Sequence, residues 1–120
     1  YILVQVNNRE SRQKEAEMLI LTANEVPGKQ VEALGLVKGN VVRSKHAGKD
    51  FMAGMKSLVG GELHGYTEML NEAREIATSR MVAEAEKLGA DAIVMMRYGS
   101  AAILQGSAEI IAYGTAVKFV

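Results

Sequence analysis

One long helical pattern limits what this chain can fold into. Between residues 62 and 88, apolar side chains recur at spacings of three and four, which predicts a single amphipathic helix. The apolar positions are Leu63, Tyr66, Leu70, Ala73, Ala77, Met81, Ala85 and Leu88. Gly89 follows, and glycine commonly ends a helix because it adopts the left-handed conformation easily. One such helix covers only one face of a sheet, so the remaining layer must be built from strands.

Four further segments have the composition of strands. Residues 18 to 23 (MLILTA) form a short apolar run that ends in turn residues, and residues 30 to 45 are mostly extended. Gly35 and Gly39 within the second segment mark a bulge or a close backbone approach, or residues 38 to 40 form a tight turn that splits it into a hairpin. Both interpretations keep this segment in the sheet.

The C-terminal third predicts a hairpin, and a short helix precedes the long one. Residues 92 to 98 and 109 to 120 are rich in Ile, Val, Met and Tyr, with the turn expected at residues 105 to 107. Asp50 can cap a helix that places five apolar residues on one face: Phe51, Met52, Met55, Leu58 and Val59. The predicted order is β, β, α, α, β, β, and the predicted class is α/β in the α+β sense, with an antiparallel sheet and both helices on one face.

The strands of this hairpin are more continuously apolar than a sheet with one buried face requires. One set of apolar residues alternates with a second set, and one helical layer cannot cover both. The sets are Ile93, Met95, Ile103, Ile110 and Val117, and Val94, Met96, Leu104, Ile111 and Ala116. We therefore expect the uncovered face to pack against a second copy of the chain.

Composition narrows the function classes. The 120 residues contain no cysteine, which excludes disulfides, thiolate metal cages and cysteine nucleophiles. Fourteen basic and fourteen acidic residues give no net charge, so we expect neither a nucleic-acid nor a membrane partner. No apolar run is long enough to span a bilayer and no signal-peptide pattern is present, so we expect a cytoplasmic protein.

The first 17 residues differ from the rest. A short β-rich run (YILVQV) is followed by a polar stretch, and Met18 then opens a new apolar run. We interpret residues 1 to 17 as a leader, which is an expression tag, an alternative start or an additional strand, and residues 18 to 120 as a single domain.

Several short motifs resemble those of a known family. They are Asn24-Glu25-Val26-Pro27-Gly28, Gly35-Leu36-Val37-Lys38-Gly39, Asp50 with Gly54, Gly60-Gly61-Glu62-Leu63 with Tyr66-Thr67, Leu88-Gly89-Ala90-Asp91-Ala92 and Ala112-Tyr113-Gly114-Thr115-Ala116-Val117. In this order the chain resembles the YbjQ-like proteins, small bacterial and archaeal chains described as a heavy-metal-binding domain of unknown function. The resemblance implies a dodecin-like two-layer subunit that assembles into a pentameric ring, and it brings no catalytic residues.

The long helix carries an acidic face that is a candidate metal site. His64, Glu68, Glu72 and Glu75 project to one side in steps of three and four, together with Asn71. Imidazole and carboxylate groups on successive turns can hold a divalent cation. No lysine or arginine lies three or four positions from these glutamates, so helical pairing does not neutralise them. The alternatives are a solvated acidic face and a salt-bridged contact between subunits.

A second candidate site is basic. Arg43, Lys45, His46 and Lys49 precede the short helix, whose N-terminus also favours anions, so these residues and Arg97 are candidates for binding a phosphate or carboxylate ligand. The alternative is ordinary surface charge, because no phosphate-binding glycine loop is present. Arg97, Tyr98, Gln105 and Glu109 are also expected to meet across the hairpin, most simply as a cross-strand charge pair.

Three function classes remain open. The first is a non-enzymatic homo-oligomer that binds a divalent metal ion or a small molecule where subunits meet. The second is an enzyme with a composite active site between subunits, and the third is an interaction scaffold. No nucleophile motif favours the enzyme, so the binding protein is the preferred interpretation.

Overall fold

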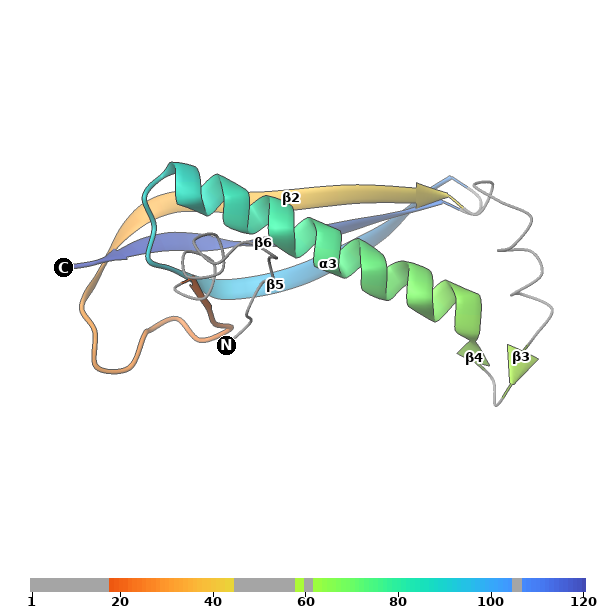
Figure 1. Ribbon diagram of the computed structural model, residues 1–120, viewed down its shortest axis with the longest axis horizontal. Coiled ribbons are helices and arrows are strands. Elements are labelled where there is room, and N and C mark those ends of the chain that lie inside the picture. The colour runs from red at the N-terminus through yellow and green to blue at the C-terminus, as the bar shows by residue number, and fades with distance from the viewer. Residues whose placement is uncertain (1–17, 45–57, 60–61, 105–106) are drawn as a thin grey trace, which may run out of the picture.

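The computed structural model describes residues 18–44, 58–59, 62–104 and 107–120. A mixed four-stranded sheet carries one long helix on one face (Figure 1). The sheet order is β1-β5-β6-β2, where β1 is Leu19–Ile20, β2 is Val31–Ser44, β5 is Ala92–Leu104 and β6 is Ser107–Phe119. The helix, α3, spans His64–Lys87. A separate pair of two-residue strands, β3 (Leu58–Val59) and β4 (Glu62–Leu63), precedes it.

The long helix is confirmed over His64–Lys87, and the role of the glycines is confirmed, but Glu62 and Leu63, predicted as its first residues, form β4 instead. The helix ends at Lys87, and Gly89 has a φ of 76°, as a left-handed helix stop requires. Residues 31 to 44 form one strand that is not split into a hairpin. Its register shifts between Ala33 and Gly35, so Gly35 lies at a bulge. Gly39 is a close approach, since a Cβ there would lie 2.6 Å from the backbone nitrogen of Met81 in the helix.

Two details of the predicted fold are wrong. The sheet is not fully antiparallel, because β1 pairs with β5 in parallel. The chain leaves β1, passes through β2 and the long helix, and returns alongside β1 in the same direction. Most of the predicted short helix lies outside the described residues, but its last two members, Leu58 and Val59, pair with β4 as a strand instead. Strand pairing there satisfies backbone groups that the last turn of a helix leaves open.

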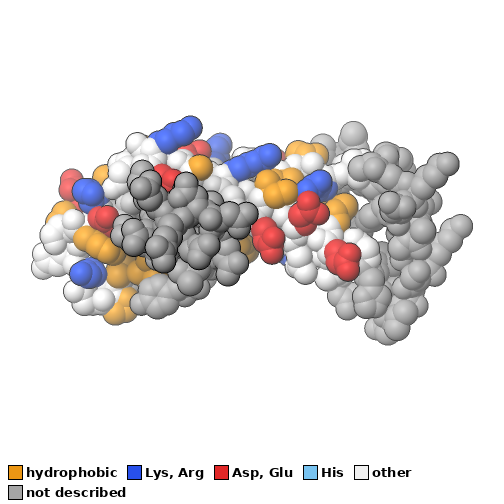
Figure 2. Space-filling view, in the orientation of Figure 1, with side chains coloured by type: hydrophobic (Ala, Val, Ile, Leu, Met, Phe, Trp, Pro, Cys, Tyr) orange, Lys and Arg blue, Asp and Glu red, His pale blue; other side chains and the backbone are white. Residues whose placement is uncertain are grey.

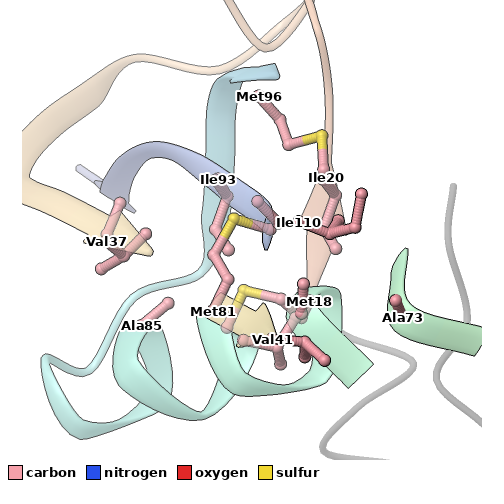
Figure 3. Close-up of a cluster of buried hydrophobic side chains, with 14 residues drawn as sticks. Met18, Ile20, Val37, Val41, Ala73, Met81, Ala85, Ile93, Met96 and Ile110 are labelled. Carbon is pink, nitrogen blue, oxygen red and sulfur yellow. The ribbon is translucent and has the colours of Figure 1, made fainter. Parts of the chain in front are cut away.

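The main core lies between α3 and the sheet. Figure 3 shows side chains from all of these elements meeting there, with Met81 of the helix among Val37, Ile93 and Ile110 of the strands. Small residues on the buried side of the helix let it lie close to the strands; these are Ala73, Ala77 and Ala85. The apolar positions predicted between residues 70 and 85 face this layer, whereas Leu88 is exposed beyond the helix end.

A bulge in β5 changes which side chains share a face. Met95 has a φ of 53°, and the register between β5 and β6 shifts between Val94 and Arg97. Ile93 and Met96 therefore both face the helix, whereas Val94 faces the other side. The predicted sets are wrong on β5, since the extra residue puts Met96 on the side of Ile93. They are also wrong on β6, where Ile110 and Ala116 face the helix and Val117 faces the other side.

Part of the opposite face is covered by the chain itself. Val26, in the connection between β1 and β2, is buried with Ala92, Val94 and Val117. The expectation that this face depends wholly on a second copy is therefore wrong at this end of the sheet. We call the rest of this face, away from α3, the back face; it includes Leu36, Lys38, Asn40, Val42, Arg97, Gly99, Ala101, Glu109, Ile111, Tyr113 and Thr115.

Candidate functional site

The acidic side of α3 is exposed. Glu68, Glu72 and Glu75 are all solvent-accessible, and Figure 2 shows acidic side chains gathered along the visible side of the helix. The backbone of His64 begins the helix, but its side chain lies outside the described set. Among the side chains that the structure describes, no three His, Asp or Glu groups come close enough together to hold one metal ion. The predicted metal site formed by His64, Glu68, Glu72 and Glu75 therefore stays a prediction.

The structure links one residue of each candidate site. Arg43 of β2 lies on the helix side of the sheet, and its Nη2 donates to Glu72 Oε1 at 2.9 Å. The Nε atom of Arg43 is buried and has no hydrogen-bond partner in the described structure. Sequence spacing within the helix misses this pair because the two residues are 29 positions apart. Of the three glutamates, Glu72 is thus the one whose charge is already matched by a strand cation.

The basic candidates do not form one described cluster. Lys45, His46 and Lys49 lie outside the described residues. Arg43 faces the helix, whereas Arg97 is opposite Tyr113 in the sheet register and lies on the back face. Within the described chain, the two arginines therefore lie on opposite sides of the sheet and cannot bind the same ligand in one subunit.

The expected polar cluster of the C-terminal hairpin does not form among its described members. Arg97 is paired with Tyr113, and Glu109 with Ala101, so no direct cross-strand charge pair joins Arg97 and Glu109. Tyr98 faces the helix instead, where its hydroxyl lies 2.7 Å from Thr78 Oγ1. Since Thr78 donates its own proton to the Arg74 carbonyl, Tyr98 is the donor in this contact. Gln105 lies outside the described residues.

An open hollow of about 460 Å³ lies on the outer side of α3. Its described lining is Glu75, Ile76, Ser79, Arg80 and Ala83. Arg80 Nη1 donates to the backbone carbonyl oxygen of Asn40, and this contact fixes the guanidinium beside the hollow. The hollow offers a carboxylate, a guanidinium and a hydroxyl above a mostly apolar floor, but it is open to solvent and would bury little of a ligand's surface.

A row across the back face brings together residues that sequence reasoning left apart. Tyr113 on the central strand β6 is paired with Lys38 of β2 on one side and with Arg97 of β5 on the other. Directly opposed residues in antiparallel strands point to the same face, so these three side chains are neighbours. Of the three, only Arg97 is among the ligand-binding residues predicted from the sequence. Residue spacing misses the row because the strand order and the bulge in β5 determine it.

Comparison with known proteins identifies the family. Residues 18–120 match the model of the family described as "Putative heavy-metal-binding". The chain belongs to this YbjQ family. It is 57% identical over 101 residues to a UPF0145 protein of Clostridium novyi, with 84% of this chain and 98% of that protein covered. It is 63% identical over 102 residues to a UPF0145 protein of Thermotoga petrophila, covering 84% and 96% of the two chains.

A solved structure supports the fold of this YbjQ family member. A crystal structure of a protein of unknown function from Pediococcus pentosaceus, which belongs to the DUF74 family, superposes with a TM-score of 0.61. It is 16% identical and covers 86% of this chain and 98% of that one. At this identity the likeness bears on the fold alone. No helix in the described part of the chain is both long and apolar enough to cross a bilayer.

Proposed function

We propose that this YbjQ family member is a non-enzymatic cytoplasmic homo-oligomer that binds a metal ion or a small molecule where its subunits meet. The observation that carries the proposal is a sheet with two open edges. In the described chain, no strand pairs with the outer side of β2, and residues 19–23 pair with β5 only as far as Met96, which leaves its outer edge unpaired from Arg97 onward. Long unpaired edges readily accept another strand, and soluble proteins rarely leave them open.

The directions of these edges favour a closed ring. β2 and β5 are both antiparallel to β6, so they run in the same direction in one subunit. If β2 of one copy pairs with β5 of the next, the contact is parallel and the same contact repeats around the assembly. A repeated head-to-tail contact must close to avoid open fibres, which favours a ring. The number five in the proposed pentamer comes from the family resemblance.

Exposed apolar residues support the same proposal. Leu36 and Val42 lie on the edge strand β2 and are 67% and 58% exposed on the back face. Burial of about 100 Å² of apolar surface is worth roughly 2.5 kcal/mol, so a few such side chains per contact favour association. The zero net charge of the chain removes the repulsion that would oppose it.

Native mass spectrometry tests this proposal because it reports subunit number and bound mass together. We expect one closed species that contains five chains of 12.9 kDa. A monodisperse monomer at micromolar concentration would contradict the ring and every site that depends on it. A ring without bound mass would support the assembly, and binding would then be tested by adding ligands to the purified ring.

We predict that the acidic face of α3 is not a tight transition-metal site. Without cysteine, its single histidine and three carboxylates supply mainly hard oxygen ligands, and Glu72 is already bound by Arg43. Calorimetry with zinc and nickel should show only weak binding, and both His64→Ala and the control His46→Ala should leave the isotherm unchanged. Stoichiometric submicromolar binding that is lost in His64→Ala but kept in His46→Ala would overturn this prediction and support the family's description.

A further inference from the structure

The row formed by Lys38, Tyr113 and Arg97 has the properties of a ligand platform. Tyr113 lies on the central strand β6 and is 39% exposed on the back face. By contrast, Ala112 and Ile110 of the same strand face the helix and are buried. Among the described residues, the cation that lies over an aromatic ring is Lys29, which covers Phe119 at 5.3 Å. Lys38 and Arg97 therefore do not lie over the ring of Tyr113, and part of this side chain is exposed on the back face.

Within the part of the chain that the structure describes, the two cations of the row have no carboxylate paired with them. The ion pairs of the described chain are Arg43 with Glu72 and Lys118 with Asp91, and neither includes Lys38 or Arg97. Glu109 is the described carboxylate of the back face. It lies four register positions along β6 from Tyr113 and accepts a hydrogen bond from Asn40 at 3.3 Å. Two unmatched cations on either side of an aromatic ring favour an anionic partner.

Arg97 is held in place by neutral groups. Its Nη1 donates to the carbonyl oxygens of Thr22 at 3.0 Å and of Met96 at 2.9 Å. These contacts fix the side chain without neutralising its charge, and they leave the Nη2 and Nε donors for other acceptors. A fixed guanidinium loses less conformational entropy when it binds an anion.

The row next to Tyr113 is apolar. Gly99 is opposite Ile111 in this row, and Ile111 Cγ2 lies 3.1 Å from the position that a Cβ of Gly99 would take, so the Ile111 side chain leans over this glycine. Ile111 is thus an apolar neighbour of the Tyr113 ring on the back face. Adjacent strands are about 4.8 Å apart, so the Cα atoms of Lys38 and Arg97 lie roughly 10 Å apart on either side of the ring.

We propose that this row binds a planar aromatic anion, stacked on Tyr113 and held by Lys38 and Arg97. The aromatic part is recognised by the exposed part of the Tyr113 side chain, and carboxylate or phosphate groups at its ends are recognised by the cations. This inference deepens the proposed binding function because it names a ligand class. The three side chains belong to one subunit, so binding and assembly can be tested separately.

Calorimetry on the full chain with three probes separates the contributions. Naphthalene-2,6-dicarboxylate carries both features, its dicarboxamide lacks the charge, and trans-cyclohexane-1,4-dicarboxylate lacks the aromatic ring. We expect the first to bind, each of the others to bind at least about fivefold more weakly, and added salt to weaken the dicarboxylate. Equal binding of the dicarboxylate and the dicarboxamide, or no binding of the dicarboxylate at millimolar concentration, would overturn the proposal.

Matched variants assign the binding to the row. Lys38→Gln and Arg97→Gln should each weaken the dicarboxylate about threefold to tenfold, whereas Lys87→Gln, at the exposed end of α3, should not change it. Tyr113→Phe should keep binding because it keeps the ring, and Tyr113→Leu should lose about fivefold or more. If Arg97→Gln fails to fold, Arg97→Lys keeps the charge and should retain most of the affinity. Unchanged affinity in both Lys38→Gln and Tyr113→Leu would place the ligand elsewhere.

Sedimentation of the same samples distinguishes this inference from the proposed function. Binding by a monomer would refute the proposed ring and leave the row intact. A ring that does not bind the dicarboxylate would refute the row and leave the assembly intact.

Discussion

Replacing Gly39 by alanine is expected to lower the free energy of unfolding by about 3 kcal/mol. A Cβ at this position would clash with the Ala77 carbonyl oxygen and lie 2.6 Å from the Met81 amide nitrogen. Both atoms belong to the helix backbone, which cannot rotate away as a side chain can. The helix must therefore move off the sheet, and this loosens the core around Val37 and Val41. Urea denaturation at a fixed protein concentration measures the effect.

Gly99→Ala is the matched control for this substitution. Gly99 also lies in a long strand, but its new Cβ would meet only the Cγ2 methyl of Ile111, at 3.1 Å. A side-chain methyl can shift by the few tenths of an ångström required, so we expect a change below about 1 kcal/mol. A loss at Gly39 no larger than that at Gly99 would show that the helix does not lie so close to β2.

The parts of the fold that follow local rules could be predicted from the sequence. The helix between residues 64 and 87 has a regular spacing of apolar residues, and Gly89 ends it because no other residue adopts that conformation as cheaply. Gly35 and Gly39 were recognisable as a bulge or a close approach, although only the packed helix shows which is which. Helix formation and the backbone conformation of glycines depend mainly on residues nearby in the sequence, so both can be predicted from it.

The features that depend on strand pairing could not be predicted. The positive φ of Met95 is uncommon for a residue with a long side chain, and nothing in the local sequence requires it. It is accommodated because Gly114 opposes the bulge, where a Cβ would lie 2.7 Å from Ile93 Cγ2 and 3.0 Å from the Val94 carbonyl oxygen. A bulge shifts the period-two pattern, so Met96 faces the helix together with Ile93, although the sequence placed these two residues on opposite faces.

The candidate sites show the same division. The acidic helix face was predictable because its residues share one helix and recur every three or four positions. Its Arg43 partner was not, since the contact depends on how β2 passes under α3. The row of Lys38, Tyr113 and Arg97 needs the order β2-β6-β5 and two exact registers, neither of which is encoded in residue spacing.

The double substitution Leu36→Lys and Val42→Lys is expected to convert the proposed ring into a monomer. Each residue is more than half exposed in the single chain, so the substitutions should change its own stability by less than about 1 kcal/mol. The lysine introduced at position 42 would face Glu109, which favours the folded chain. In an assembly that uses the back face, the same changes remove about 5 kcal/mol of apolar burial per contact and add two charges.

Sedimentation at micromolar concentration measures the result, with Leu88→Lys as the control. Leu88 is 47% exposed at the end of the helix, so its substitution makes the same chemical change without touching the back face. A loss of about 5 kcal/mol weakens association more than about a thousandfold. We therefore expect the double variant to sediment as a 12.9 kDa monomer and Leu88→Lys to sediment as the unsubstituted chain does. If the double variant assembles as the unsubstituted chain does, the contact must use the strand edges without the back face. If Leu88→Lys also dissociates, the helix end takes part, and the geometry of the proposed contact is wrong.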